Sequence, residues 1–468
     1  MGEPIRRSPV SAVQSGDKRS EIYEKGLSKS HQNKHGVYYT PKNIAMQFFR
    51  DLPPDRSTLT FCDPCCGTGN FLIAALESGF AAENVFGYDV DPIAVEIARQ
   101  RMQSLTSQEA QNVQVKNFMG VADPIPTFDV IFTNPPWGQK LPKRTRTALA
   151  KQFGAGKSDD TSALFLFAAM QVLSDGGTLG MLLPDAFFNI GRFSDARVKV
   201  LAYRILSMTD FGRPFAGVMT KVTSIILQKA DPKRSDTVAC TNDKGTHLRD
   251  QQSFLLNPKF QLNFALSTAD HDVIRHLFRQ PHCTLKNRAA WALGIITGDN
   301  KRYIREAPTP GHLAVVKGAD ISADGLTDPS CFIPDDLSLY QQVPPISHYQ
   351  AEEKLIYCFR SQRLVFFHDT DKRYLLSSAN LLVPDSGFPV RGDVLAQFLS
   401  CDLVNWVFHS IFETHKVLRS DLEWLPIFHK HLHNLSAFNE DKLLEYLGIQ
   451  EDVSGSYKIK EVQNEQVF

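Results

Sequence analysis

Between Thr58 and about Gln228, short apolar runs alternate with stretches in which apolar residues recur every three to four positions. The first pattern predicts buried strands and the second predicts amphipathic helices. Strands that are joined by helices pack as a mainly parallel sheet, so this region is predicted to be an α/β domain. Seven strands are expected, near 58–62, 84–88, 112–117, 128–133, 177–183, 205–211 and 222–228. Helices are expected between them, near 71–78, 92–105, 163–174 and 193–203.

The rest of the chain follows other patterns. Residues 1–35 are polar and lack apolar periodicity, which predicts a flexible basic arm that is at most partly helical. The α/β domain is assigned to residues 36–230, and the polar, irregular stretch 231–260 is expected to be a linker. Aromatic residues and short strand-like runs over 261–468 indicate a second domain of mixed α+β type. A chain of 468 residues is long enough for two such domains.

Composition adds little to this organisation. Apolar residues make up 43% of the chain and charged residues 22%, as in ordinary globular proteins. No apolar run is long enough to span a membrane and no secretory signal opens the chain, so we expect a soluble, cytoplasmic protein without a membrane partner.

The formal net charge is zero, so any phosphate-binding surface must come from local basic clusters. One cluster lies in the arm and consists of Arg6, Arg7, Lys18, Arg19, Lys25, Lys29 and Lys34. The other consists of Lys140, Lys143, Arg144, Arg146, Lys151 and Lys157. A basic loop by itself is more often a solvated face than a binding site.

Three of the eight cysteines, Cys62, Cys65 and Cys66, stand close together. No second close pair of Cys or Cys and His accompanies them, as a zinc site would require, so no metal is expected. The sparse cysteines are expected to be reduced, and these three to be small residues packed around a tight turn.

A glycine turn follows the first expected strand and opens the first helix. Gly67 and Gly69 let the backbone turn tightly and approach a ligand that side chains would exclude. Asp63, at the end of the strand, is placed to pair with the amino group of an amino-acid moiety. A glycine turn alone is a weak signal, because many nucleotide-binding folds contain one.

The ends of the next two strands also carry candidate ligand-binding residues. A carboxylate at the end of the second strand, Asp89, is placed to accept the ribose hydroxyls of an adenosine-containing cofactor. Asp91, which precedes Pro92, is expected to cap the following helix. Asn117 and Phe118 follow the third strand and are candidates for the edge and face of adenine. A dinucleotide fold would share these features, but the third glycine of its fingerprint is missing here.

The most informative stretch is Asn134-Pro135-Pro136-Trp137, directly after the fourth strand. A planar exocyclic or amide nitrogen is a poor nucleophile, because its lone pair is delocalised. Two fixed acceptors, the Asn134 side-chain oxygen and the Pro135 carbonyl, could hold its hydrogens and stabilise the positive charge that develops during attack. The prolines stiffen the loop, and Trp137 offers a surface on which a planar target stacks. The structural alternative is a rigid loop with a packed tryptophan.

In this order, the motifs resemble those of the gamma group of N6-adenine DNA methyltransferases from restriction-modification systems. In that group a Tyr-Thr-Pro segment precedes the glycine motif, as Tyr39-Thr40-Pro41 does here. The run Asp63-Pro64-Cys65-Cys66-Gly67-Thr68-Gly69 is similar to the group's Asp-Pro-Ala-Cys-Gly-Ser-Gly. Two departures are Asn117, where the group often has Asp, and Trp137, where Tyr or Phe is commoner.

The resemblance implies a Rossmann-like, seven-stranded methyltransferase domain that uses S-adenosyl-L-methionine, followed by a target-recognition domain that binds double-stranded DNA. It implies that a flipped adenine meets Asn134 and stacks on Trp137. The residues that it assigns to the cofactor are Tyr39, Thr40, Pro41, Asp63, Cys65, Gly67, Gly69, Asp89, Val90, Asn117 and Phe118.

The resemblance extends downstream to about residue 430. Phe215 corresponds to an aromatic that stacks on the other face of the base, and a core phenylalanine is the competing interpretation. The segments that resemble turns of the recognition region are 294–303, 316–321, 374–380 and 412–422.

Other enzyme classes use the same acceptor pair. Methyltransferases that act on guanine N2 in RNA or on glutamine amides in proteins are alternatives, as is a catalytically silent DNA-binding relative. The large second domain and the Tyr39-Thr40-Pro41 segment favour DNA, and the intact Asn134 and Asp89 argue against a silent relative. Because only about 35 residues precede the first motif, any cognate restriction endonuclease is expected to be a separate protein.

Overall fold

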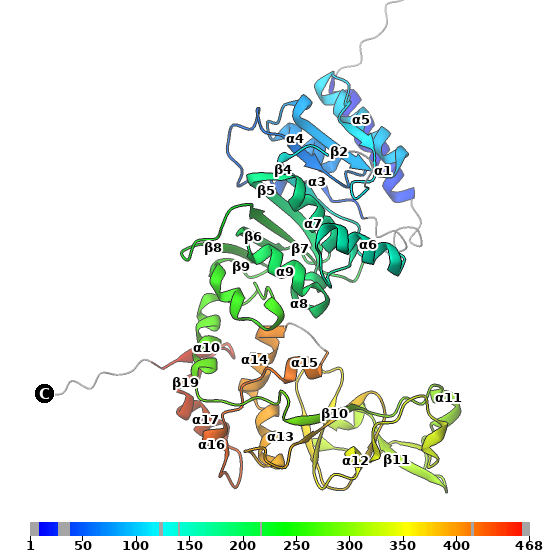
Figure 1. The fold of residues 1–468 in the computed structure, drawn as a ribbon, viewed down its shortest axis with the longest axis vertical. Helices are drawn as coiled ribbons and strands as arrows, with labels where there is room; N and C mark the ends of the chain where they lie inside the picture. Colours follow the sequence, from blue (N-terminus) through cyan, green and yellow to red (C-terminus); the bar gives the residue numbers. More distant parts are fainter. Residues whose placement is uncertain are drawn as a thin grey trace, which may run out of the picture. The chain divides into compact units, whose positions relative to one another are not determined.

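The computed structural model describes residues 9–26, 38–120, 125–138, 141–215, 218–412 and 416–460, and of residues 9–16 it describes the backbone alone (Figure 1). The basic residues Arg6, Arg7, Lys29, Lys34 and Lys140 lie outside these ranges. The chain divides into two compact units, Met1–Ser267 and Thr268–Phe468. The second domain was expected to start at residue 261, and the second unit begins at Thr268.

Within the described part of the first unit, nine strands form one sheet in the order β3-β2-β1-β4-β5-β7-β6-β8-β9. Strands β1 to β5 pair in parallel, and β7 runs antiparallel between β5 and β6. The first seven strands are those that the apolar pattern predicted, so the α/β fold is confirmed. The bounds are β1 Phe61–Asp63, β2 Val85–Asp89, β3 Val113–Val115, β4 Phe128–Thr133, β5 Leu173–Pro184, β6 Arg204–Asp210, β7 Val222–Gln228, β8 Thr237–Asn242 and β9 Gly245–Asp250.

The expected linker contains two of these strands, so residues 237–250 are part of the sheet and not a linker. β8 pairs in parallel with β6, and β9 pairs antiparallel with β8. Val238 and Cys240 of β8 face the hydrophobic core, and their neighbours are more exposed. An edge hairpin with one solvated face contains few apolar residues, which is why its sequence is polar enough to suggest a linker.

The four expected helices of the first unit are present as α4, α5, α7 and α9. Asp91 caps α5 as expected, because its Oδ1 accepts hydrogen bonds from the backbone N–H groups of Ile93 and Ala94. A helix that the sequence did not predict, α6, follows the Asn134 loop. The bounds are α1 Pro9–Gly26, α3 Lys42–Gln47, α4 Asn70–Glu77, α5 Pro92–Thr106, α6 Lys143–Phe153, α7 Thr161–Val172, α8 Ala186–Asn189 and α9 Ser194–Leu201.

The expected flexible arm is helical over α1, which lies alongside α5 (Figure 1). Asp17 of α1 forms an ion pair of 2.8 Å with Arg101 of α5. The side chain of Glu24 accepts a hydrogen bond of 2.6 Å from the Thr68 hydroxyl. Because α1 docks through such polar contacts, it lacks the apolar periodicity by which the sequence reveals other helices.

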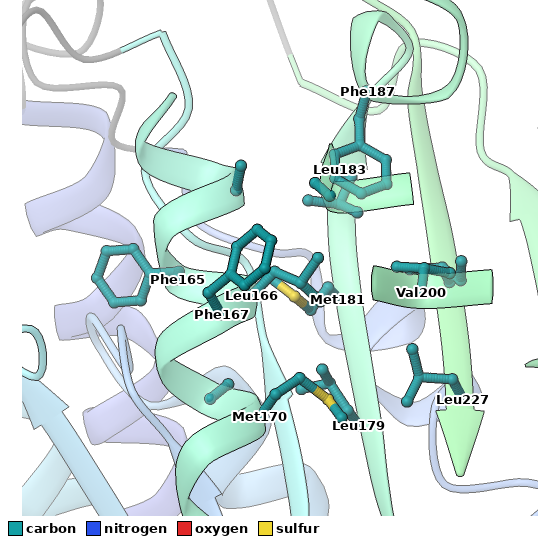
Figure 2. Close-up of a cluster of buried hydrophobic side chains, with 14 of the residues drawn as sticks. Phe165, Leu166, Phe167, Met170, Leu179, Met181, Leu183, Phe187, Val200 and Leu227 are labelled. Carbon is teal, nitrogen blue, oxygen red and sulfur yellow. The ribbon is translucent and has the colours of Figure 1, made fainter. Parts of the chain in front are cut away.

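Hydrophobic cores fill both faces of the sheet, because successive strand residues point to opposite sides. In β4, Ile131 packs in one core, and Val130 and Phe132 pack in the other. Figure 2 shows the first core, where Phe167 and Met170 of α7 lie near β5. Fully burying one such side chain stabilises the fold by about 1.5–3 kcal/mol. The carboxyl ends of β1 to β4 are thereby held rigidly at one edge of the sheet.

The second unit has a mixed α+β fold, as the sequence predicted. Its described strands include a four-stranded antiparallel sheet, β10-β18-β15-β16, and a three-stranded sheet, β14-β11-β17. The strands are β10 Ala289–Leu293, β11 His312–Val316, β12 Ile321–Ser322, β13 Gly325–Leu326, β14 Cys331–Pro334, β15 Lys354–Cys358, β16 Phe366–Asp369, β17 Tyr374–Leu375, β18 Ala379–Pro384, β19 Ile449–Glu451 and β20 Tyr457–Ile459. The helices are α10 Thr268–Arg279, α11 Asn300–Tyr303, α12 Ile346–Tyr349, α13 Gly392–Ser400, α14 Asp402–Phe412, α15 Arg419–Leu422, α16 His429–Leu432 and α17 Glu440–Leu447.

Three of the segments that resemble recognition turns meet in this unit. The backbone N–H of Gly294 donates to the carbonyl of Ala379, and that of Gly318 donates to the Ser378 hydroxyl. A Cβ at Gly294 would lie 2.2 Å from the Leu376 carbonyl oxygen, so only glycine permits this approach. In the fourth segment, residues 413–415 lie outside the described ranges.

Among the described residues, no single helix is long and apolar enough to cross a membrane, and the one pair that would suffice jointly, α13 and α14, is bent by 59°. The same residues contain no group of three or more His, Cys, Asp or Glu side chains that could hold a metal ion.

Candidate active site

A cavity of about 560 Å³ lies at the carboxyl ends of β1 to β4. This volume falls within the range of about 300–1,000 Å³ that small-molecule sites occupy. Most of the residues that the sequence singled out line the cavity, namely Tyr39, Thr40, Asp63, Cys65, Gly67, Asp89, Val90, Asn117, Phe118, Asn134 and Pro136. Pro41, Gly69, Pro135, Trp137 and Phe215 are not among its lining residues.

The glycine turn brings the backbone close to its neighbours. Gly67 and Gly69 have φ angles of +51° and +91°, which side chains disfavour. A Cβ at Gly67 would lie 2.7 Å from Cε1 of Tyr39, so the tyrosine ring packs directly against this glycine. Cys65 is half-buried, and burial raises the pKa of its thiol, as expected for a small packing residue.

Asp63 is an almost completely buried carboxylate at the end of β1. Its Oδ1 accepts hydrogen bonds from the Cys65 backbone N–H at 3.0 Å and from the Thr133 hydroxyl at 2.7 Å. Burial raises the pKa of Asp63 to about 7, although both hydrogen bonds act in the opposite direction. Such a group favours a cationic ligand, since a nearby positive charge stabilises the ionised form.

Asp89 is the acidic residue at the end of β2. Its Oδ2 accepts from the Gly67 backbone N–H at 2.8 Å, and its Oδ1 accepts from the Asp91 backbone N–H at 2.9 Å. Each carboxylate oxygen can accept a second hydrogen bond, so two hydroxyls can still bind. Burial raises the pKa of Asp89. The next residue, Val90, is exposed.

The loop after β3 supplies an aromatic wall. Phe118 is buried and stacks on Phe165 of α7, with ring centroids 6.1 Å apart and planes 10° apart. The Asn117 side-chain oxygen accepts from the Met119 backbone N–H at 3.1 Å, which fixes the turn. Asn117 therefore has a local structural role as well as its place in the cavity lining.

The Tyr39-Thr40-Pro41 segment directly precedes α3 in the chain and packs against the glycine turn. The Thr40 carbonyl accepts from the Asn70 side chain at 2.8 Å, at the start of α4. The Pro41 carbonyl accepts from the backbone N–H groups of Ile44 and Ala45, which begins α3. Hydrogen bonds to the starts of α3 and α4 thus hold the segment in place, and Tyr39 and Thr40 line the cavity.

Two hydrogen bonds fix the orientation of the Asn134 amide. Its Nδ2 donates to the Tyr38 backbone carbonyl at 2.7 Å. Its Oδ1 accepts from the indole Nε1–H of Trp137 at 3.1 Å. The sequence did not identify Tyr38, which lies one residue before the Tyr-Thr-Pro segment and joins that segment to the Asn134 loop.

Tyr38 also contacts both rings that were assigned to the target base. It stacks on Trp137 at 4.8 Å between centroids and on Phe215 at 5.5 Å. Trp137 and Phe215 are 7% and 8% exposed, and their own centroids are 6.2 Å apart. Ala216 and Gly217, which follow Phe215, lie outside the described residues. The structure therefore brings the two predicted stacking residues together, with Tyr38 against each.

Helix α6 has one face in the cavity and one in solvent. Thr145 and Leu149, one turn apart, line the cavity. Lys143, Arg144 and Lys151, from the second basic cluster, are exposed. Arg146 forms an ion pair of 2.9 Å with Asp159. The basic cluster is thus largely a solvated helix face next to the cavity.

Further lining residues were not predicted. Some flank the motifs and could have been found by proximity, whereas Tyr23, Thr145 and Phe165 belong to helices that only the fold brings to the cavity. The full set is Tyr23, Tyr38, Pro64, Cys66, Thr68, Asn70, Phe71, Asp91, Lys116, Met119, Leu141, Thr145, Leu149 and Phe165.

Two family models match the chain. The model described as N-6 DNA Methylase matches residues 14–263, which include most of α1, the nine-stranded sheet and the cavity. The model described as TaqI-like C-terminal specificity domain matches residues 313–427, inside the second unit.

Curated relatives resemble the chain over different lengths. The Type II methyltransferase M.VspI of Vibrio sp. (strain 343) is 46% identical over 307 residues, which cover 65% of this chain and 75% of that protein. The Type II methyltransferase M.CvrRI of Paramecium bursaria Chlorella virus XZ-6E is 26% identical over 221 residues, or 46% of this chain and 54% of that protein. The chain thus spans about half the length of the viral relative.

Two solved structures share the fold. The type IIL restriction-modification enzyme MmeI in complex with DNA gives a TM-score of 0.55 at 12% identity, covering 86% of this chain and 69% of that chain. The DrdV–DNA complex gives a TM-score of 0.52 at 11% identity, covering 79% of this chain and 51% of that chain.

Proposed function

The chain belongs to the N-6 DNA methylase family, and from that premise we propose that it methylates the exocyclic N6 of adenine in double-stranded DNA. Membership confirms the expected kinship with the methyltransferases of restriction-modification systems, and S-adenosyl-L-methionine is the methyl donor. The observation that carries the adenine proposal is the fixed amide of Asn134, whose oxygen is a preformed acceptor at the cavity.

The residues around the cavity fit this cofactor. Gly67 lets the backbone itself line the cavity, and Asp63 and Asp89 provide a buried and a half-buried carboxylate for a cationic amino acid joined to a ribose. We assign the amino group to Asp63, the ribose hydroxyls to Asp89, and the adenine edge and face to Asn117 and Phe118. The bound cofactor supplies a methyl group on a sulfonium, which makes that methyl electrophilic.

Asn134 and Pro135 would make the target nitrogen reactive. The Asn134 oxygen and the Pro135 carbonyl accept the two N6 hydrogens and favour a more tetrahedral nitrogen, so its lone pair is directed out of the ring. The same acceptors would stabilise the positive charge on nitrogen as the new N–CH₃ bond forms and the methyl–sulfur bond breaks, and the nitrogen then loses one of its two protons. Pro135 and Pro136 restrict the loop, which limits the reorganisation needed in the transition state.

Adenine must leave the duplex to reach this position, so we propose base flipping. Trp137 and Phe215 supply aromatic surfaces for the extruded base, and Tyr38 lies against both in the structure. The exposed basic face of α6 is suited to phosphate contacts beside the cavity. A TaqI-like specificity domain favours DNA over the RNA and protein alternatives. We also expect a separate cognate restriction endonuclease.

The proposal is tested by sequencing DNA from methylation-free cells that express the protein. N6-methyladenine is expected at one defined sequence. Methylation that is absent, or found only on cytosine N4, would overturn the adenine assignment. Asn134→Ala should abolish transfer from labelled cofactor in vitro while leaving cofactor affinity within about threefold of the wild type. Asp175→Asn, at an exposed position near the start of β5, serves as the matched surface control.

A further inference from the structure

Helix α1 contributes a side chain to the cofactor cavity. Tyr23 is among the lining residues, together with Asp89 and Asp91. Its hydroxyl donates a hydrogen bond to Oδ2 of Asp91. The other oxygen of Asp91 caps α5 by accepting from Ile93 and Ala94. Tyr23 therefore binds the one oxygen of Asp91 that does not cap α5. Asp91 lies two residues after Asp89, the acid assigned to the ribose.

Independent contacts hold α1 against the cavity wall. The Thr68 hydroxyl, in the glycine turn, donates to Glu24 at 2.6 Å, and Ser20 donates to the same carboxylate at 2.8 Å. Both Thr68 and Ser20 are buried. The helix is thus attached to the turn that carries Gly67 and Gly69.

One buried guanidinium links α1 to the start of α4. Arg101 is 5% exposed and donates to Asp17 of α1 at 2.8 Å. The same group donates to the Thr68 carbonyl at 2.7 Å and to the Asn70 side chain at 2.9 Å. A buried charge needs such a complete set of partners, so loss of α1 would leave Arg101 without its carboxylate.

We propose that α1 is a wall of the cofactor site and that Tyr23 positions the Asp89–Asp91 turn for the ribose, an inference that rests on the cofactor assignment above. Because Tyr23 donates a hydrogen bond to Asp91, Asp89 is the acid that faces the ribose hydroxyls. Burial and the Asp91 hydrogen bond both raise the pKa of Tyr23, so the phenol stays a neutral donor at physiological pH. Binding and α1 docking are then linked, and each strengthens the other.

The test compares Tyr23→Phe and Tyr23→Ala with Glu21→Gln. Glu21 lies on the same helix, its side chain is 66% exposed, and within the described residues it forms an ion pair with Lys25, four positions further along the helix. Dissociation constants for S-adenosylmethionine and for the demethylated product are measured by calorimetry on the full chain. Tyr23→Phe should raise both dissociation constants about tenfold, as expected for a lost hydrogen bond to a charged group. Glu21→Gln should match the wild type.

Two further measurements separate positioning from a purely structural role. Tyr23→Phe should raise the KM for cofactor while kcat at saturation stays within about twofold, with the melting temperature of the cofactor-free protein unchanged. In the wild type, cofactor should slow amide exchange over residues 17–26, and Tyr23→Ala should remove that effect. Unchanged affinity in both Tyr23 variants would overturn the inference, whereas a wild-type protein that binds no cofactor would overturn the proposed function itself.

Discussion

The indole Nε1–H of Trp137 donates a 3.1 Å hydrogen bond to the side-chain oxygen of Asn134. Two residues of one four-residue motif are thus hydrogen-bonded to each other. The acceptor that we assign to an adenine N6 hydrogen already accepts from one N–H donor, and its second lone pair is left for the base. This hydrogen bond limits the cost of keeping a polar acceptor in a half-buried position.

Trp137→Phe and Trp137→Ala should therefore behave differently. Phenylalanine removes the indole donor but keeps a stacking surface, and Asn134 is still held by the Tyr38 carbonyl. We expect the single-turnover methylation rate of Trp137→Phe to stay within about tenfold of the wild type. Alanine also loses base stacking, which contributes about 1–3 kcal/mol per base, so a fall of about 100-fold or more is expected. Equal defects in both variants would mean that the indole donor, not the ring, is what base binding needs.

Asp89→Asn should weaken cofactor binding. The two oxygens of Asp89 accept from Gly67 and Asp91, and an amide retains only one acceptor. Hydrogen bonds to charged groups contribute about 1.5–3 kcal/mol, so the dissociation constant for S-adenosylmethionine should rise about 10- to 100-fold. Equilibrium binding measures this directly, with Asp175→Asn as the surface control. An unchanged dissociation constant would contradict the assignment of Asp89 to the ribose.

Cofactor affinity should depend on the protonation of Asp63. Because burial raises its pKa to about 7, the folded protein binds a proton there that an unfolded chain releases above about pH 4. The contribution of Asp63 to stability therefore falls as pH rises from about 4 to 7. A cationic amino group prefers the ionised form, so affinity should increase as pH approaches 7 from below, by at most about tenfold per unit. Calorimetry across this range should give a flat profile for Asp63→Asn; the same slope in that variant would assign the titration to another group.

The parts of the fold that the sequence predicted are those with local signals. In β7 both faces of the strand are buried, so apolar residues follow one another at Ile225, Ile226 and Leu227, and the limits of the strand were predicted without error. The N-cap of α5 was predicted because an aspartate before a proline favours that position. Likewise, most of the motif residues meet at one cavity, because parallel strands end at the same sheet edge.

The parts that the sequence missed depend on contacts between distant residues. Asp17 and Arg101 are 84 positions apart, and neither carries a pattern that pairs it with the other. Tyr38 reaches Trp137 and Phe215 only after the sheet has formed. Polar docking of a helix and an aromatic contact across loops leave no periodicity along the chain, so neither could be predicted from one sequence.

The second unit contains a buried ion pair, and removing one partner alone should destabilise this unit. Lys354 Nζ lies 2.5 Å from Oδ2 of Asp369, both side chains are 0% exposed, and Arg373 donates to the other carboxylate oxygen. Burial alone would raise the pKa of Asp369, but these two cations hold it below its ordinary value. Its stabilising effect is therefore present above about pH 4 and is lost as pH falls through the lowered pKa.

Asp369→Ala leaves the buried Lys354 ammonium without this carboxylate. It should lower the free energy of unfolding by about 3–5 kcal/mol, measured by urea titration at pH 7. Lys354→Met combined with Asp369→Leu removes both charges and should recover most of that loss; a double variant as unstable as Asp369→Ala would show that packing, not the unpaired charge, sets the cost.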